Sequence, residues 1–332
     1  MPSRIIFPEK GHVALQVFEL PPTGEAEVRV RTLYSLMSIG TETTILHQRY
    51  DPGTHFDRMF SFPQLQTGVQ AVGVIEEVGP QVAEYAVGDR VFMRMAHRSH
   101  AVLAAELCSP VPDAMDSKQA YWCGLAKTAF RAAWAAPFEP GCQVLIIGAG
   151  PVGQMTTRWA HAAGVDAITV VDLSATRLKH AIVGGATTVL EGDVAQHLEA
   201  IADQSNSGTP TVVVDTTGNP VAFQHALAAA PQFGKVILLG DTGYPGRQCL
   251  TSDLMTKGLT VQAVHDSHDR DGWTARRTDA KFFASVLEGS FNLSGLISRE
   301  FSPMDCEKAY ALAEQNREDV VGILYNWSDA ES

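Results

Sequence analysis

The chain has 332 residues, of which 45% are hydrophobic and 19% are charged, and its formal net charge is −12. At about 100–200 residues per domain this length indicates two domains, and the acidic balance disfavours nucleic acids and anionic membranes as partners. No stretch approaches the ~18 consecutive apolar residues that a membrane span requires.

The five cysteines are scattered and odd in number, which argues against a disulfide scaffold. Charged residues, among them Arg4, Glu9 and Lys10, interrupt the N-terminus, so it does not have the pattern of a secretory signal. Together these features predict a protein of the reducing cytoplasm.

The first ~120 residues have the pattern of a β-rich domain, in keeping with the size of one domain. Residues 27–31 and 71–75 are short apolar or alternating runs of the kind that predicts half-buried antiparallel strands. Gly79-Pro80 and Gly88-Asp89 are turn signals between such runs.

The middle of the chain carries continuous apolar runs, which are typical of parallel strands buried on both faces. Segments with helical spacing separate them, for example Val152, Met155, Trp159 and Ala163. This alternation predicts a doubly wound parallel sheet, the Rossmann fold. The six predicted strands are 144–147, 168–171, 188–190, 212–214, 236–239 and 259–264.

After about residue 265 the pattern changes again. A polar stretch, 265–279, precedes a helical segment and a last strand at 320–325. This tail is too short for a domain of its own, so we expect it to return to the N-terminal domain. The predicted division is therefore 1–120 with 270–332 as one domain, and 121–269 as the inserted Rossmann domain.

The motif Gly148-Ala149-Gly150-Pro151-Val152-Gly153 follows the first of these strands and begins a helix. In that context G-x-G-x-x-G predicts dinucleotide binding. Gly148 permits the tight turn, Gly150 the approach of the pyrophosphate, and Gly153 the packing of helix on strand. The first turn of the helix offers free N–H groups to the phosphates. The predicted cofactor set is Gly148, Gly150, Pro151, Val152, Gly153, Asp172, Arg177, Thr216 and Gly240.

Asp172 ends the second strand of the predicted sheet, 24 positions after Gly148. A carboxylate there accepts hydrogen bonds from the ribose hydroxyls and repels a 2′-phosphate, which favours NAD over NADP. Arg177, five residues later, is either a solvated helix residue or a group that contacts the ribose or a phosphate.

The layout resembles the medium-chain dehydrogenase/reductase superfamily, whose best-known members are zinc alcohol and polyol dehydrogenases. The residues that carry the resemblance are 73–79 (Gly-Val-Ile-Glu-Glu-Val-Gly), 88–91 (Gly-Asp-Arg-Val) and the glycine motif, in the family's order. Residues 40–42 and 111–113 add to it. The resemblance implies a GroES-like catalytic domain, a Rossmann domain, a nicotinamide cofactor and a homodimer.

The zinc ligands of that family are missing. Ile39 stands at the first cysteine position, Val69 at the histidine position, and only Cys123 matches a ligand. One thiol cannot hold catalytic zinc, which needs about three protein ligands. The segment Ser38-Ile39-Gly40-Thr41-Glu42 instead resembles a zinc-less branch with a Gly-Thr-Glu motif, to which bacteriochlorophyllide a dehydrogenase belongs.

Without a metal, another group must polarise the carbonyl oxygen and exchange the hydroxyl proton. Lys127 is our first candidate, because it lies one helical turn after Cys123 in an Ala-rich segment that should lower its pKa. By resemblance this position faces the nicotinamide, and Thr41 matches the family's proton-relay hydroxyl. A surface lysine and a turn threonine are the alternatives, and Glu42 is expected to be structural, paired with an arginine.

Histidines near the predicted cleft are further candidates for proton exchange. His97 and His100 follow a strand that borders the cleft in relatives, and His265 and His268 follow the last Rossmann strand. We include His97 in the predicted catalytic set with Lys127 and Thr41, and we predict no metal site.

These patterns predict a zinc-independent, NAD-dependent dehydrogenase of a secondary alcohol such as a polyol or cyclitol. Two alternatives stay open. One is a quinone or enone reductase, which Asp172 disfavours because such relatives generally use NADPH. The other is a catalytically inactive dinucleotide-binding protein.

Overall fold

The N-terminal lobe is built from strands in which alternate residues are buried. In β3 (Glu27–Leu36) burial alternates along most of the strand, as expected of a half-buried antiparallel strand. The computed structural model describes residues 1–136, 138–205, 211–240, 242–269 and 271–328. The other elements of this lobe are β1 (Ser3–Phe7), β2 (Ala14–Val17), α1 (Ile39–Leu46), α2 (His55–Met59), β4 (Leu65–Gln66), β5 (Ala71–Val78), β6 (Arg90–Met93), β7 (His100–Ala104), β8 (Cys108–Pro110) and α3 (Ser117–Ala120).

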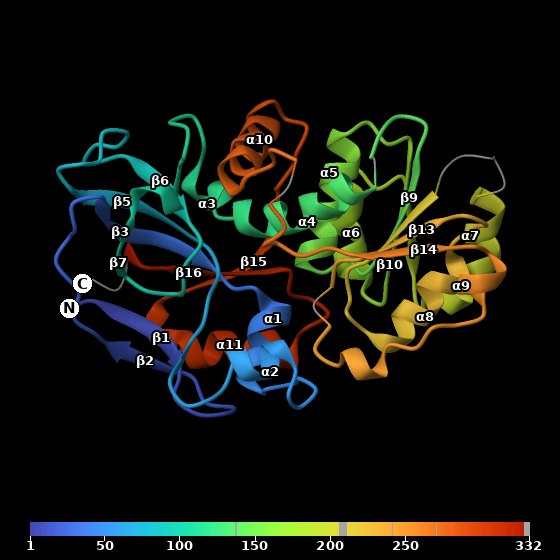
Figure 1. The fold of residues 1–332 in the computed structure, drawn as a ribbon, viewed down its shortest axis with the longest axis horizontal. Coiled ribbons are helices and arrows are strands. Elements are labelled where there is room, and N and C mark those ends of the chain that lie inside the picture. The colour runs from blue at the N-terminus through green and yellow to red at the C-terminus, as the bar shows by residue number, and fades with distance from the viewer. Residues whose placement is uncertain (137, 206–210, 241, 270, 329–332) are drawn as a thin grey trace.

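The second lobe contains a six-stranded parallel sheet with helices on both faces (Figure 1). Its order is β11-β10-β9-β12-β13-β14, the strand order of a Rossmann domain. The six strands coincide with the six predicted apolar runs, so the predicted fold class is confirmed. They are β9 (Gln143–Ile147), β10 (Ala167–Asp172), β11 (Thr188–Glu191), β12 (Thr211–Asp215), β13 (Lys235–Leu238) and β14 (Thr260–Ala263). The helices are α4 (Cys123–Ala135), α5 (Pro151–Ala162), α6 (Ala175–Val183), α7 (Leu198–Ser205), α8 (Pro220–Ala229) and α9 (Asp253–Thr256).

The C-terminal segment returns to the first lobe, where it is drawn in red among the blue and cyan strands (Figure 1). It forms β15 (Ile297–Phe301), α11 (Cys306–Gln315) and β16 (Gly322–Asn326). β16 pairs with β3 in the larger sheet. The helix α10 (Ala275–Leu287) begins within the polar stretch 265–279, where Thr274 caps its first turn.

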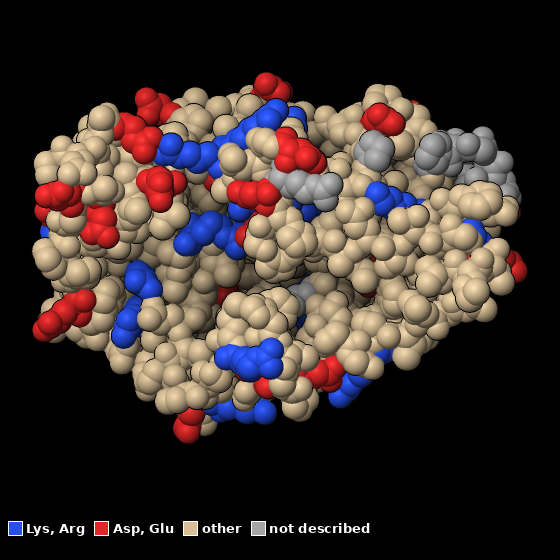
Figure 2. All heavy atoms as spheres, in the orientation of Figure 1, with Lys and Arg blue, Asp and Glu red and all other residues tan. Residues whose placement is uncertain are grey.

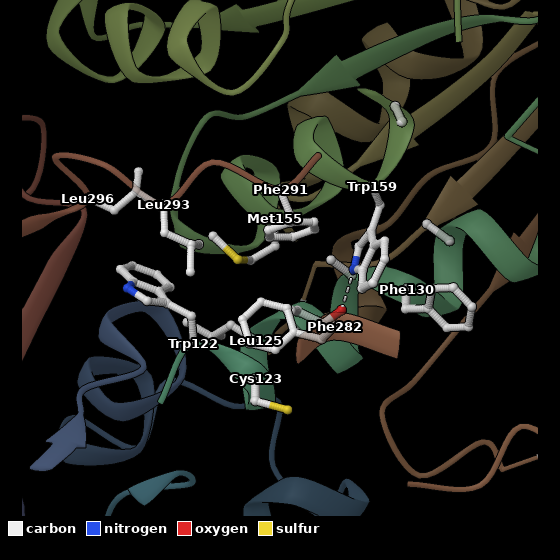
Figure 3. Packing of buried hydrophobic residues seen from close by; sticks show 14 of the residues in the cluster. Trp122, Cys123, Leu125, Phe130, Met155, Trp159, Phe282, Phe291, Leu293 and Leu296 are labelled. Carbon is white, nitrogen blue, oxygen red and sulfur yellow. Dashed lines mark hydrogen bonds between the residues drawn. The ribbon is translucent and has the colours of Figure 1, made fainter. Parts of the chain in front are cut away.

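A shared core joins the two lobes along α4 and α5. Figure 3 shows the aromatic and aliphatic side chains of this core, in which Trp159 donates its indole N–H to the Ala126 carbonyl at 2.7 Å. Cys123 and Leu125 place the start of α4 against the same core. The helix that carries the catalytic candidate is thus fixed by buried contacts. Within the described ranges, no helix has the length and apolar character needed to cross a bilayer.

Candidate functional site

The glycine turn between β9 and α5 has the geometry that a bound phosphate needs. Gly148 has φ +94°, a left-handed conformation that favours glycine. A Cβ on Gly153 would lie 1.9 Å from the Gly148 carbonyl oxygen, so the packing of helix on turn excludes any side chain. A Cβ on Gly150 would meet only Arg177 Nη1, at 3.9 Å. Gly150 therefore faces open space.

The N-terminus of α5 is free to bind an anion. Gly150 is its N-cap and Pro151 occupies the first turn, where the missing N–H of proline costs nothing. No side chain of the described residues caps this end of the helix. Its free N–H groups and the positive end of the helix dipole therefore point toward the open space at Gly150.

A cavity of about 560 Å³ extends from this turn across both lobes. On the Rossmann side it includes eight of the nine predicted cofactor residues, all except Gly153, which packs behind the turn. On the other side it is lined by the loop and helix at 38–44, including Thr41, and by Leu125 of α4. Figure 2 shows a hollow between the lobes, with basic and acidic side chains at its edge. The cavity has a size suited to a small-molecule or cofactor site.

The carboxylate of Asp172 lies on the cavity wall at the end of β10. One of its oxygens accepts a hydrogen bond from Ala149 N at 2.6 Å and the other from Ser174 N at 2.8 Å. Each oxygen keeps a second lone pair that can accept from a ribose hydroxyl. The same side chain thus stabilises the glycine turn and can contact the cofactor.

Arg177 joins the two lobes. Its guanidinium donates to the backbone carbonyls of Arg317 and Val320, in the segment between α11 and β16. Burial lowers its pKa, which Asp172 partly counteracts. Arg177 is therefore not a solvated helix residue, and its Nη1 stays on the cavity side, 3.9 Å from the Cβ position of Gly150.

Sequence reasoning missed the contribution of the C-terminal segment to the cavity. Arg317 and Glu318 line it beside Asp172, and Ser174 Oγ donates to the Glu318 carbonyl at 2.7 Å. These residues lie about 140 positions from α6 in the chain, so no local pattern could have indicated the contact.

The position where zinc-dependent relatives hold their metal does not fit zinc in this chain. Ile39 is apolar, and burial raises the pKa of the Cys123 thiol well above its usual range, which opposes the thiolate that zinc needs. Gln70 is fully buried and accepts a hydrogen bond from Leu125 N at 3.0 Å, so it holds α4. Among the described residues, no cluster of three or more His, Cys, Asp or Glu side chains could bind a metal ion.

Lys127 lies in a charged cluster, so the apolar environment expected for it is incorrect. Its Nζ is 3.7 Å from Asp266 Oδ1 and 3.9 Å from Asp269 Oδ1. Arg94 of the other lobe also pairs with Asp266, at 2.8 Å, and Arg131 pairs with Asp269. Lys127 is not on the cavity wall itself, although Leu125, two residues earlier, is.

His97 is enclosed rather than exposed to the cavity. It is fully buried, and its Nε2 lies 3.1 Å from Glu42 Oε2. Its Nδ1 lies 2.7 Å from Ser35 Oγ, which accepts the indole N–H of Trp327. Since Trp327 can only donate, the Ser35 hydroxyl has its own proton left for Nδ1. His97 thus bridges Glu42 and Ser35 within the buried interior.

Glu42 is the centre of this buried network and pairs with His97, not with the arginine that we expected. Besides His97 it accepts hydrogen bonds from Ser38 N at 2.6 Å, Thr67 Oγ1 at 2.7 Å and Tyr310 OH at 2.5 Å. Burial raises the pKa of Glu42, but His97 and these donors outweigh it, so the pKa lies below its usual value. Glu42 thereby fixes the first turn of α1, which carries Thr41.

Of the other three candidate histidines, His265 and His268 are exposed and His100 is half-buried. His265 stacks near Phe56 of α2, with ring centroids 6.1 Å apart, and this contact joins the two lobes at the cleft mouth. His268 lies beside His265, and His100 is 3.7 Å from Glu76.

Two family models match the chain, one on each side of the cleft. "Alcohol dehydrogenase GroES-like domain" matches residues 24–138, and "Zinc-binding dehydrogenase" matches residues 151–275. The sorbitol dehydrogenase of Arabidopsis thaliana is 26% identical over 94% of this chain and 92% of its own length.

Solved structures share the fold. An alcohol dehydrogenase of Escherichia coli CFT073 solved with NADH is 18% identical, with TM-score 0.81, and a protein of Sinorhizobium meliloti 1021 solved with NADP is 18% identical, with TM-score 0.82. Each alignment covers 98% of this chain and 99% of the other. With both lobes matched, the chain belongs to the medium-chain superfamily of alcohol-dehydrogenase-like oxidoreductases.

Proposed function

We propose that this oxidoreductase interconverts a secondary alcohol, such as a polyol or cyclitol, and its ketone, with NAD(H) and without zinc. The observation that carries the proposal is the single cavity that connects the Asp172 carboxylate and the glycine turn with Thr41. The Gly40-Thr41-Glu42 segment beside Ile39 supports membership of the zinc-less branch that includes bacteriochlorophyllide a dehydrogenase.

The cofactor is held by the chain's backbone and one carboxylate. The N-terminus of α5 binds the pyrophosphate at Gly150, and Asp172 accepts hydrogen bonds from the adenosine ribose. Bound nicotinamide supplies the hydride acceptor or donor. At the other end of the cavity, Thr41 Oγ1 exchanges the proton of the substrate hydroxyl.

Lys127, two residues after Leu125 of the cavity wall, supplies positive charge to the substrate end of the cavity. Its ammonium has three donors, and among the described residues none of them has a partner within hydrogen-bond distance, since both carboxylates lie beyond 3.5 Å. An ammonium with unused donors can stabilise a developing alkoxide or a carbonyl dipole. His97, enclosed beneath the first turn of α1, positions Thr41 through Glu42 and does not touch the substrate.

Two further properties belong to the proposal. We place the protein in a reducing cytoplasm, which suits its five free cysteines. We also propose a homodimer acting on a small-molecule substrate.

A reductase of quinones or enones is the second candidate, and Arg317 is the observation that favours it. This arginine lies on the cavity wall in the region of Asp172, where a cation could accept the 2′-phosphate of NADP. The two carboxylates Asp172 and Glu318 on the same wall oppose that.

The deciding experiment measures cofactor affinity, metal content and activity on one preparation. We expect NADH to bind more tightly than NADPH, less than one zinc per chain, and oxidation of secondary alcohols that a chelator does not inhibit. Preference for NADPH with quinone reduction would favour the reductase. Stoichiometric zinc would refute the metal-free mechanism, and NADH binding without turnover would indicate an inactive protein.

A further inference from the structure

Two arginines that have no acidic partner among the described residues lie together at the small outer sheet β2-β1-β4, away from the cofactor cavity. Arg4 of β1 is joined to Arg98 by an isolated β-bridge. Both guanidinium groups lie near the ring of Phe18, with their carbon atoms 5.2 and 5.8 Å from its centroid. The side chains are half-buried.

Neither guanidinium is neutralised by the described part of the chain. Arg4 Nε donates to Gln16 Oε1 at 2.9 Å, and Arg98 Nη2 donates to Gln66 Oε1. Both acceptors are uncharged amides. By contrast, Arg29 on the neighbouring strand β3 pairs with Glu77 at 2.7 Å.

Burial and the like charge of Arg4 both act against the Arg98 cation. Together they lower the pKa of Arg98, and burial is the larger cause. In addition, Arg98 Nε is buried and has no hydrogen-bond partner in the described residues. Two adjacent cations on a chain of net charge −12 carry an electrostatic cost that a bound anion would remove.

The unused polar groups of this cluster are all donors. Because Gln16 and Gln66 each use the side-chain oxygen to accept from an arginine, each amide has its NH₂ group left to donate. The remaining guanidinium N–H groups can also only donate. A cluster with two guanidinium groups and two free amide NH₂ groups suits an oxyanion and no cation.

We propose that Arg4 and Arg98, with the amides of Gln16 and Gln66, bind the phosphate or carboxylate group of a small molecule at a site separate from the dehydrogenase cleft. Forked guanidinium groups match the oxygens of either group in a bidentate manner. The site lies wholly within the N-terminal lobe and is independent of the proposed reaction.

Binding is tested by calorimetry with inorganic phosphate and with succinate, in chloride buffer at constant ionic strength. The Gly150→Val background blocks phosphate at the cofactor turn, so that heat from that site does not contribute. Comparison of the two probes distinguishes a phosphate site from a carboxylate site.

We expect Arg4→Gln and Arg98→Gln each to weaken binding about tenfold or more, the scale of a lost charged hydrogen bond. Arg29→Gln, the matched control, should bind like the parent. Arg98→Lys keeps the charge but loses the paired N–H donors of the guanidinium group, so it should weaken anion binding. Measured in the absence of anion, its thermal unfolding midpoint should equal that of the parent. The proposal is overturned if neither probe binds above the chloride control, or if the two glutamine variants bind as tightly as Arg29→Gln.

Discussion

The two ends of the cavity are built in different ways. At the cofactor end, the shape is set by backbone: Gly148 needs its positive φ, and Gly153 has no room for a Cβ. At the end where we propose catalysis, side chains from distant segments support the wall from behind, as in the Glu42–His97 pair and the cluster at Lys127. The cofactor end is thus encoded by a local sequence motif, whereas the proposed catalytic end depends on long-range contacts. Substitutions can therefore disrupt each end separately.

The largest expected effect is at the catalytic end, in Glu42→Gln. The NH₂ group of the new amide would face donors that now bind the carboxylate, so hydrogen bonds would be lost. Disrupting a buried ion pair costs about 3–5 kcal/mol. The free energy of unfolding at pH 7, measured in urea, should fall by that order, and Glu76→Gln, in an exposed pair with Arg31, should change it little.

The pH dependence of the same variant is a second readout. Because the pKa of Glu42 is lowered from 4.5 in the folded state, its ionisation stabilises the fold above about pH 4.5, and this contribution is lost as the pH falls through the folded pKa. The difference between Glu42→Gln and the parent should therefore narrow as the pH falls below 4.5. A constant difference would contradict the charged state of Glu42.

At the cofactor end, Gly150→Val should abolish tight NADH binding while leaving the fold intact. Its φ of −67° is open to any residue, and the added side chain enters the cavity where the pyrophosphate must lie. We expect a loss of about a hundredfold or more in affinity, ~2.7 kcal/mol. Gly150→Ala, with a single methyl group, should lose less. Unchanged NADH affinity in the valine variant would show that the pyrophosphate does not bind at this turn.

The proposed role of Lys127 is tested by measuring kcat. Lys127→Ala should reduce kcat by about a hundredfold, the scale for a positioned acid–base group or oxyanion donor, while NADH affinity stays the same. Lys127→Arg should recover little, since guanidinium differs in shape. Lys118→Ala, an exposed lysine paired with Glu300, is the control. Full activity in Lys127→Ala would leave Thr41 as the remaining candidate.

The smallest expected effect is in cofactor choice. Asp172→Asn keeps an oxygen for the turn but loses the charge, so NADH should bind about tenfold more weakly, ~1.4 kcal/mol. NADPH is the internal control, because loss of the carboxylate removes repulsion from its 2′-phosphate. If the ratio of the two affinities does not change, Asp172 acts only on the turn.

The sequence by itself determined the Rossmann strands and the glycine turn. Parallel strands buried on both faces need continuous apolar runs, and a turn without room for a Cβ needs glycine, so both leave a local pattern. At the positions that the resemblance assigns to zinc ligands, the sequence also shows Ile39 and Val69, whose side chains cannot coordinate zinc.

Only the tertiary structure decided what surrounds each charged side chain. Arg94, Asp266 and Asp269 reach Lys127 from segments 33 to 142 positions away, and the enclosure of His97 depends on Glu42, 55 positions earlier. A charged residue has the same local pattern whether water, a carboxylate or a cavity faces it. Its partner and burial depend on chain segments that the fold brings together, because electrostatic and packing contacts act through space and not along the sequence.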